Sequence, residues 1–211
     1  MKSSARSREI WVSLKPVMLL ALLVILQLAG SAGHAWAHSA GGQTGGLIDG
    51  LLHPISGLDH VLAMVAVGLW GAQLGAPAIW LLPITFPVVM AFGGLLGLLG
   101  VPLPGTEIGI ALSALVLGVM VFAEARPPIW LSMTIVGVFA IFHGHAHGSE
   151  LPDDATPLLY SLGFVTATGL LHATGISVGL IHRWPAGRMA LRGAGAAIAC
   201  AGPVFLWMSL A

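Results

Sequence analysis

Six long apolar runs constrain this chain more than any other feature. They cover approximately residues 51–74, 77–100, 106–123, 128–147, 157–181 and 189–210, and short breaks of polar residues, proline or glycine separate them. Each run is close to the roughly 20 residues that an α-helix needs to cross the bilayer core. Strands of a membrane barrel would be about half as long and would alternate in polarity. We therefore predict an all-α integral membrane protein, a bundle of six transmembrane helices.

The composition narrows the possible functions. Only 8% of the 211 residues are charged, against about 25% in soluble domains. The single cysteine, Cys200, excludes an internal disulfide and a thiolate-rich zinc site. No basic segment suited to nucleic acid is present, and no Gly-x4-Gly-Lys-Ser/Thr loop exists for direct use of ATP. The lipid bilayer is the surrounding that this composition implies.

The first 37 residues have the form of a signal peptide. Four basic residues precede a short apolar stretch at 17–29, and Ala35-Trp36-Ala37 has the small-x-small pattern of a cleavage site. An uncleaved first membrane helix is the alternative. Cleavage would leave residues 38–211 as the membrane domain. It would also make His38 the new N-terminus, where an amine beside an imidazole could chelate a metal.

The arginines predict the orientation in the membrane. The four Lys/Arg outside the signal segment flank the breaks after the third and fifth runs, namely Arg126, Arg183, Arg188 and Arg192. Both breaks are cytoplasmic if the mature N-terminus is exported across a bacterial inner membrane, as the positive-inside rule requires. Both mature termini are then periplasmic. Four tryptophans at the cytoplasmic ends are expected to be interfacial anchors: Trp70, Trp80, Trp130 and Trp184.

Two polar clusters interrupt the apolar runs, and this orientation places both on the outer side. One cluster contains His53, Asp59 and His60, and the other contains His143, His147 and Glu150. An ionisable group at the centre of a membrane helix costs about 2.5–3.5 kcal/mol and by default indicates a functional site. Imidazole nitrogens suit nickel, copper, zinc and cobalt, and carboxylates add charge neutralisation. We therefore predict that these six residues form one site for a divalent transition-metal ion.

The local geometry of each cluster stays open at this point. His53 lies two turns, about 11 Å, from His60 on a straight helix. Either Pro54 and Gly57 bend the backbone and shorten that distance, or His53 is an entrance site and His60 a deeper one. Asp59 is either a ligand or a partner that orients an imidazole.

The second cluster has two possible geometries. On a continuous helix His143, His147 and Glu150 share a face and His145 points away. If Gly144 and Gly148 break the helix, all three histidines point to one side.

For the remaining polar residues, the alternative to metal binding is a structural role within or between helices. The further candidate ligands are Met64, His145, His172 and His38. His172 is either a ligand on the transport path or a hydrogen-bonding link between helices. Hydroxyls on the fifth run are expected to donate to carbonyls of their own helix: Thr166, Thr168, Thr174 and Ser177. The corresponding positions of the two clusters, on helices one and four, suggest a three-plus-three inverted repeat.

The two clusters resemble the two signatures of the HupE/UreJ family. His53-Pro54 through Asp59-His60, followed by Met64, matches the first signature, and residues 142–150 (FHGHAHGSE) match the second, Phe-His-Gly-x-Ala-His-Gly-x-Glu. The resemblance covers essentially the whole chain. The first motif is also similar to the His-x4-Asp-His signature of nickel/cobalt permeases, but here the spacing is one residue longer.

The resemblance implies a non-enzymatic secondary transporter of Ni2+ that feeds the maturation of nickel-iron hydrogenase or urease. It implies the same six metal-handling residues, no prosthetic group, and cytoplasmic nickel chaperones as partners. Alternatives are a cobalt permease, a membrane metallochaperone that binds nickel without transporting it, a membrane metalloenzyme and a bis-histidine haem protein. The short loops leave little room for an enzyme's substrate pocket.

Overall fold

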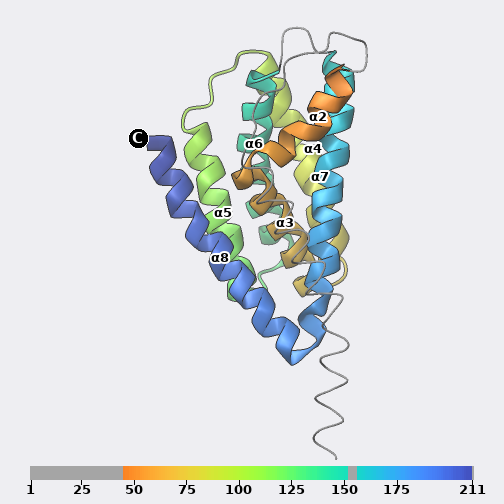
Figure 1. Ribbon diagram of the computed structural model, residues 1–211, viewed down its shortest axis with the longest axis vertical. Coiled ribbons are helices and arrows are strands. Elements are labelled where there is room, and N and C mark those ends of the chain that lie inside the picture. The colour runs from red at the N-terminus through yellow and green to blue at the C-terminus, as the bar shows by residue number, and fades with distance from the viewer. Residues whose placement is uncertain (1–44, 152–155, 211) are drawn as a thin grey trace, which may run out of the picture. The chain divides into compact units, whose positions relative to one another are not determined.

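A computed structural model describes residues 45–151 and 156–210 of the chain. The expected signal peptide and His38 lie outside these residues. Every regular element in the described part is helical, which confirms the all-α prediction. The elements are α2 (Gly45–Ser56), α3 (Leu58–Leu74), α4 (Ala78–Leu98), α5 (Thr106–Phe122), α6 (Ile129–Ser149), α7 (Pro157–Gly179), the 3-10 helix η1 (Leu180–Arg183) and α8 (Pro185–Leu210) (Figure 1).

The chain is a multi-pass membrane protein by the length and composition of its helices. Four helices are each long and apolar enough to cross a bilayer: α4, α6, α7 (which continues through η1) and α8. The pair α2 and α3 forms a fifth candidate span if this bent pair is counted as one. With 17 residues, α5 is apolar but shorter than a typical span. Six complete spans therefore remain a prediction.

α4 shows how these helices meet both protein and lipid. Its inner face buries Leu82, Phe86 and Met90. The apolar side chains on another face are 50–64% exposed: Ile84, Val88, Phe92 and Leu95. A water-soluble helix would carry polar side chains on its exposed face. Apolar residues on both faces are what a helix between a protein core and lipid tails requires.

The helices pair through glycines that let their backbones approach closely. In the described part α4 packs on α6, α3 and α2 pack on α7, and α5 packs on α8; the α5–α8 pair is seen side by side in Figure 1. A methyl group at Gly144 or Gly148 of α6 would collide with the backbone of α4 at Met90 or Gly94. In lipid no hydrophobic effect drives helices together, and small residues at helix interfaces instead allow close van der Waals packing.

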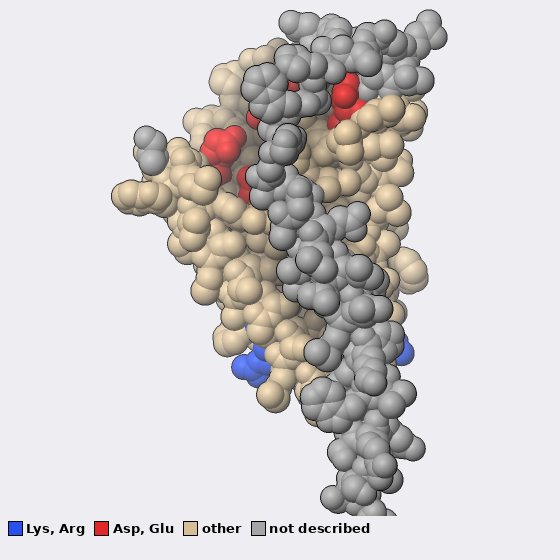
Figure 2. All heavy atoms as spheres, in the orientation of Figure 1, with Lys and Arg blue, Asp and Glu red and all other residues tan. Residues whose placement is uncertain are grey.

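Charged side chains separate along the bundle. Figure 2 shows acidic residues toward one end of the visible face and Lys/Arg toward the other. Trp80, Trp130 and Trp184 are 64%, 65% and 56% exposed. Trp70, in contrast, is fully buried and donates its indole N–H to the carbonyl of Ala125 at 2.9 Å.

The prediction that Trp70 is an interfacial anchor is therefore wrong. The reason is the position of α3, which α4, α5, α7 and α8 all contact.

Candidate metal centre

The helix expected over residues 51–74 is instead two helices that meet at an angle. α2 ends at Ser56, α3 begins at Leu58, and their axes differ by 81°. Gly57 between them has an extended backbone, with φ −96° and ψ 115°. Pro54, one turn earlier, has no N–H for the helix ladder, which weakens α2 just before the break. Figure 1 shows α2 slanting from α3 toward α7.

The bend brings His53 and His60 to the same neighbour. The ring centroids of His53 and His147 are 4.7 Å apart, and those of His60 and His147 are 4.5 Å apart. On a straight helix the two turns between His53 and His60 would separate them by about 11 Å along the axis. The structure combines the two arrangements left open by the sequence: the backbone is bent, and the side chain of His53 is still more exposed than that of His60.

Asp59 orients the imidazole of His60. Its Oδ1 accepts a hydrogen bond from the backbone N–H of His60 and lies 2.9 Å from Nδ1 of the same residue. A proton on Nδ1 is donated to this carboxylate, so Nε2 keeps a free lone pair. Nε2 of His60 is buried and has no hydrogen-bond partner in the part of the chain that the structure describes. A carboxylate that fixes the tautomer of a metal-binding histidine in this way is common around metal ions.

The break at Gly57 also makes room for this pair. A methyl group at Gly57 would lie 2.8 Å from Oδ1 of Asp59 and 2.9 Å from Nδ1 of His60. A larger residue at this position would therefore displace the side chains of Asp59 and His60, which fold back over Gly57.

α6 stays helical through both glycines of the second motif and ends at Ser149. His143 and His147 are therefore one turn apart on the buried face. His145 points away, and its Nε2 lies 2.7 Å from the carbonyl of Val101 in the α4–α5 connection. The helical alternative is the one found, and Gly144 and Gly148 serve close packing on α4.

The buried nitrogens on α6 are left free. Nδ1 of His143 lies 2.9 Å from the carbonyl of Phe139 and donates to it, so Nε2 keeps its lone pair, which has no partner within residues 45–151 and 156–210. Neither ring nitrogen of His147 has a partner among the described residues. Buried polar groups are nearly always hydrogen-bonded, so unpaired ones need an explanation such as a missing ion.

The four imidazoles form a continuous series that we call the histidine ladder: His53, His147, His60 and His143. Successive ring centroids are 4.7, 4.5 and 4.8 Å apart. The side chain of His53 is 30% exposed at one end, while His143 is fully buried at the other. The ladder thus leads from the surface into the core.

An outer triad stands at the exposed end of the ladder. One ligand atom from each of His53, His147 and Glu150 lies within 4.8 Å of the others. Nε2 of His53 is 3.3 Å from Oε2 of Glu150. This hydrogen bond from His53 is the main cause that lowers the pKa of Glu150, and partial burial opposes it. Two imidazoles and an ionised carboxylate suit a divalent transition-metal ion.

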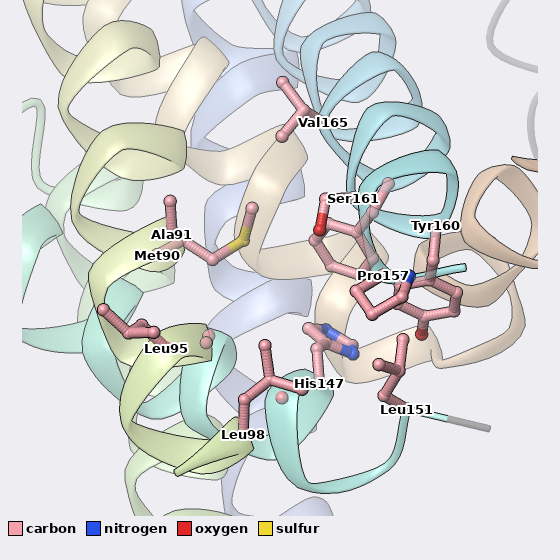
Figure 3. Close-up of a pocket in the computed structure, with 14 residues that line it drawn as sticks. Met90, Ala91, Leu95, Leu98, His147, Leu151, Pro157, Tyr160, Ser161 and Val165 are labelled. Atoms are coloured by element: carbon pink, nitrogen blue, oxygen red, sulfur yellow. The ribbon is translucent and has the colours of Figure 1, made fainter. Parts of the chain in front are cut away.

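A cavity of about 270 Å³ lies between α4, α6 and α7 beside the ladder. Figure 3 shows His147 and Tyr160 at this cavity, opposite apolar side chains that include Met90 and Leu98. The cavity provides space next to His147, whose two ring nitrogens both lack a hydrogen-bond partner among the described residues.

Three aromatic residues around the ladder were missed by sequence reasoning. Tyr160 and Phe164 of α7 lie 5.8 and 4.1 Å, centroid to centroid, from His53 and His147 respectively. Phe86 of α4 lies 5.4 Å from His143. The only signal was that Tyr160 is the single tyrosine of the chain. Nothing in the pattern of α4 separates Phe86 from its apolar neighbours.

The additional candidates take different places. Met64 is fully buried one turn beyond His60, and His172 is 2% exposed on α7 next to Phe86. His145 is apart from the ladder, and His38 is outside the described residues.

Comparison with known proteins agrees with the motifs. The family model described as "HupE / UreJ protein" matches residues 25–205. The chain is 45% identical over 172 residues to "Protein HupE" of Rhizobium leguminosarum bv. viciae, which covers 82% of this chain and 90% of that relative. No solved structure matches.

Proposed function

Because the chain belongs to the HupE/UreJ family, we propose that it is a permease of the bacterial inner membrane for divalent transition-metal ions. Its substrate is Ni2+, taken up from the periplasm to supply the maturation of a hydrogenase or urease. The observation that carries this proposal is the histidine ladder. Imidazole nitrogens without partners lie in the interior of a membrane bundle and connect to an exposed triad.

The geometry supports a path for the ion. A hydrated ion would first meet the outer triad, where Glu150 is exposed and His53 is half-buried. It would then pass to Nε2 of His60, held by Asp59, and to Nε2 of His143. The two carboxylates offset the two positive charges of the ion, which reduces the cost of taking it into the membrane. A negative potential inside the cell favours entry by about 2.3 kcal/mol per charge per 100 mV.

The proposed orientation places the outer triad in the periplasm and the arginine-rich end in the cytoplasm. Both mature termini are periplasmic, and cytoplasmic nickel chaperones receive the ion. The three-plus-three repeat is part of this proposal. In such a repeat α3 corresponds to α6 and α4 corresponds to α7. The α4–α6 contact of one half then corresponds to the α7–α3 contact of the other, and both pairs of helices are packed together.

The test is the accumulation of nickel, cobalt, zinc and copper by cells that express the wild type or His60→Ala at equal membrane levels. We expect raised nickel that disappears in His60→Ala. His182→Ala is the matched control because His182 is in η1, where Nδ1 bonds the carbonyl of Gly179. Raised cobalt instead would identify a cobalt permease.

Purified protein in vesicles separates transport from binding alone. Ni2+ bound by the purified protein without flux into vesicles would replace the permease by the metallochaperone. Neither binding nor flux of any of the four metals would remove both.

A further inference from the structure

We propose that His172 forms an inner ion station, distinct from the histidine ladder and separated from it by the ring of Phe86. Thr168 and the backbone carbonyl of Pro83 complete the station. The inference deepens the proposed function and rests on it for the direction of ion movement. Three observations on buried groups support it.

His172 lies far from the exposed end of the ladder. It follows Tyr160, which contacts His53, by 12 positions on the same helix, equivalent to about 18 Å of rise. The direction is toward η1 and Arg183, at the opposite end from Glu150. His172 is 2% exposed, so a station there would be in the interior of the bundle.

The polar atoms of this region lack partners. Neither ring nitrogen of His172 has a partner in strict hydrogen-bond geometry among the described residues, although the carbonyl of Pro83 on α4 lies next to the ring. Thr168 is one turn earlier on the same face, fully buried, and its hydroxyl also has no partner. Leaving a buried polar group unsatisfied costs about 1–3 kcal/mol.

The prediction that Thr168 donates to a helix carbonyl is therefore wrong, although it holds for its neighbours. The hydroxyls of Thr166, Thr174 and Ser177 donate to carbonyls four residues earlier at 2.7, 2.9 and 2.8 Å. The difference is the side of α7 on which each hydroxyl lies, because Thr168 alone of the four is fully buried.

A third donor comes from the backbone of α4. The carbonyl of Pro83 would normally accept from the N–H of residue 87, but residue 87 is also proline and has no N–H. This carbonyl lies beside the imidazole of His172 without reaching hydrogen-bond geometry. An imidazole, a hydroxyl one turn earlier on the same face of α7 and a backbone carbonyl of α4 are thus available in this region. They are a weaker ligand set than the ladder and suit an ion that must leave again.

Phe86 stands between the two groups of donors. Its ring centroid is 5.4 Å from that of His143, the deepest imidazole of the ladder, and 5.4 Å from that of His172. Phe86 is fully buried. An ion that moves from His143 to His172 passes the ring of Phe86, so the two groups are separate stations in this proposal.

The experiment combines binding and flux in the full mature chain. Radioactive Ni2+ binding to purified protein gives the number of ions bound at saturation, and proteoliposomes give the rate of uptake. The variants are His172→Ala and Thr168→Val, with His182→Ala and Thr166→Val as matched controls of the same residue types. If His172→Ala does not purify as a folded protein, His172→Gln keeps the polar volume and replaces it.

We expect His172→Ala or His172→Gln to bind one ion fewer than the wild type and to lose at least tenfold in uptake. His147→Ala should lose outer binding and keep the ion at His172. Wild-type uptake by the His172 variant, or lost uptake with unchanged stoichiometry, would overturn the inner station. If the wild type moves no ion, the permease proposal fails. The stoichiometries alone then decide whether the inner station exists.

Discussion

At the scale of single residues, the free nitrogens distinguish this site from ordinary packing. His53, His60, His143 and His147 contact one another through their rings, yet Nε2 of His60 and His143 and both nitrogens of His147 remain unpaired. His145, on the same helix, has a carbonyl partner instead. Alternate histidines of one motif therefore have different roles, one pair facing the ladder and one residue fastening a loop.

His147→Ala and His145→Ala should separate these roles. We expect His147→Ala to weaken Ni2+ binding by purified protein by about 10- to 100-fold or more, since it removes one of the two residues shared by the triad and the ladder. His145→Ala should bind nickel within a fewfold of the wild type, because its ring bonds Val101. Equilibrium dialysis at fixed pH measures both. Equal losses in the two variants would contradict the assignment.

The pH dependence of binding should follow the imidazoles and not Glu150. An imidazole nitrogen binds a metal only when it carries no proton, so protons compete with the metal for these nitrogens. We therefore expect Ni2+ affinity to fall as the pH decreases from 7.5 to 5.5. The pKa of Glu150 is lowered from 4.5, chiefly by the hydrogen bond from His53, so its carboxylate remains ionised throughout this range.

The lowered pKa of Glu150 also determines how the stability of the fold depends on pH. The contact of Glu150 with His53 stabilises the folded protein above the ordinary carboxyl range, and this stabilisation is lost as the pH falls through the lowered pKa.

Nickel binding by Glu150→Gln, measured from pH 5 to 8, should be weaker but should decline over the same interval as in the wild type. A flat profile in Glu150→Gln would show that the carboxylate is the titrating group.

At the scale of elements, the site depends on one broken helix and one continuous helix. The 81° bend at Gly57 turns His53 back toward α6, and the uninterrupted α6 presents His143 and His147 on one face. Discontinuous helices are a recurrent way to place polar groups at membrane depth, because the break leaves backbone and side-chain groups free to bind an ion. Glycine has two different structural roles here. At Gly57 it accommodates the bend, and at Gly144 it brings two helices together.

Gly144→Ala should damage the fold, and Gly169→Ala should not. A methyl group at Gly144 meets the carbonyl of Met90 on α4, so the two helices must separate. A methyl group at Gly169 of α7 has nothing within 4 Å, and alanine in a helix is favoured over glycine by about 0.5–1 kcal/mol. Thermal unfolding in detergent should show a lower midpoint for Gly144→Ala and an equal or higher one for Gly169→Ala. The reverse order would disprove the packing argument.

In the molecule as a whole, the arginines and the proposed metal-binding groups lie at opposite ends of the bundle. Arg183 and Arg188 lie around the turn from α7 to α8, while Glu150 closes α6 at the end where the ladder begins. Arginines near membrane helix ends favour the cytoplasm. The entrance of the ladder is then on the opposite, periplasmic side.

Reporter fusions should establish this topology. We expect alkaline phosphatase fused after residue 211 to be active, since an even number of spans returns the C-terminus to the periplasm. Fusion at residue 126 should be inactive because Arg126 is predicted to be cytoplasmic. A cytoplasmic reporter at residue 126 is the control and should give the opposite result. Phosphatase activity at residue 126 would reverse the proposed direction of transport.

Patterns in the amino-acid sequence are sufficient to predict the class of fold and to select candidate site residues. Apolar length required membrane helices, and polar residues that are costly in lipid marked His53, Asp59, His60, His143, His147 and Glu150 without any coordinates. The prediction of apolar membrane helices holds because the membrane imposes the same energetic requirement on every residue that it surrounds, whereas the six ligands stay a prediction. The hydroxyl bonds of Thr166, Thr174 and Ser177 were also predictable, since they need only their own helix.

The contacts between groups on different helices come from the packing of the bundle and could not be predicted from the sequence. The burial of Trp70 follows from the central position of α3, and the free hydroxyl of Thr168 from the side of α7 that faces the core. Phe86 and His172 became neighbours because α4 and α7 pack around the same interior. Such contacts depend on the packing of helices distant in sequence. A nearly uniform apolar pattern cannot encode them, because in lipid both the inner and the outer face of a helix are apolar.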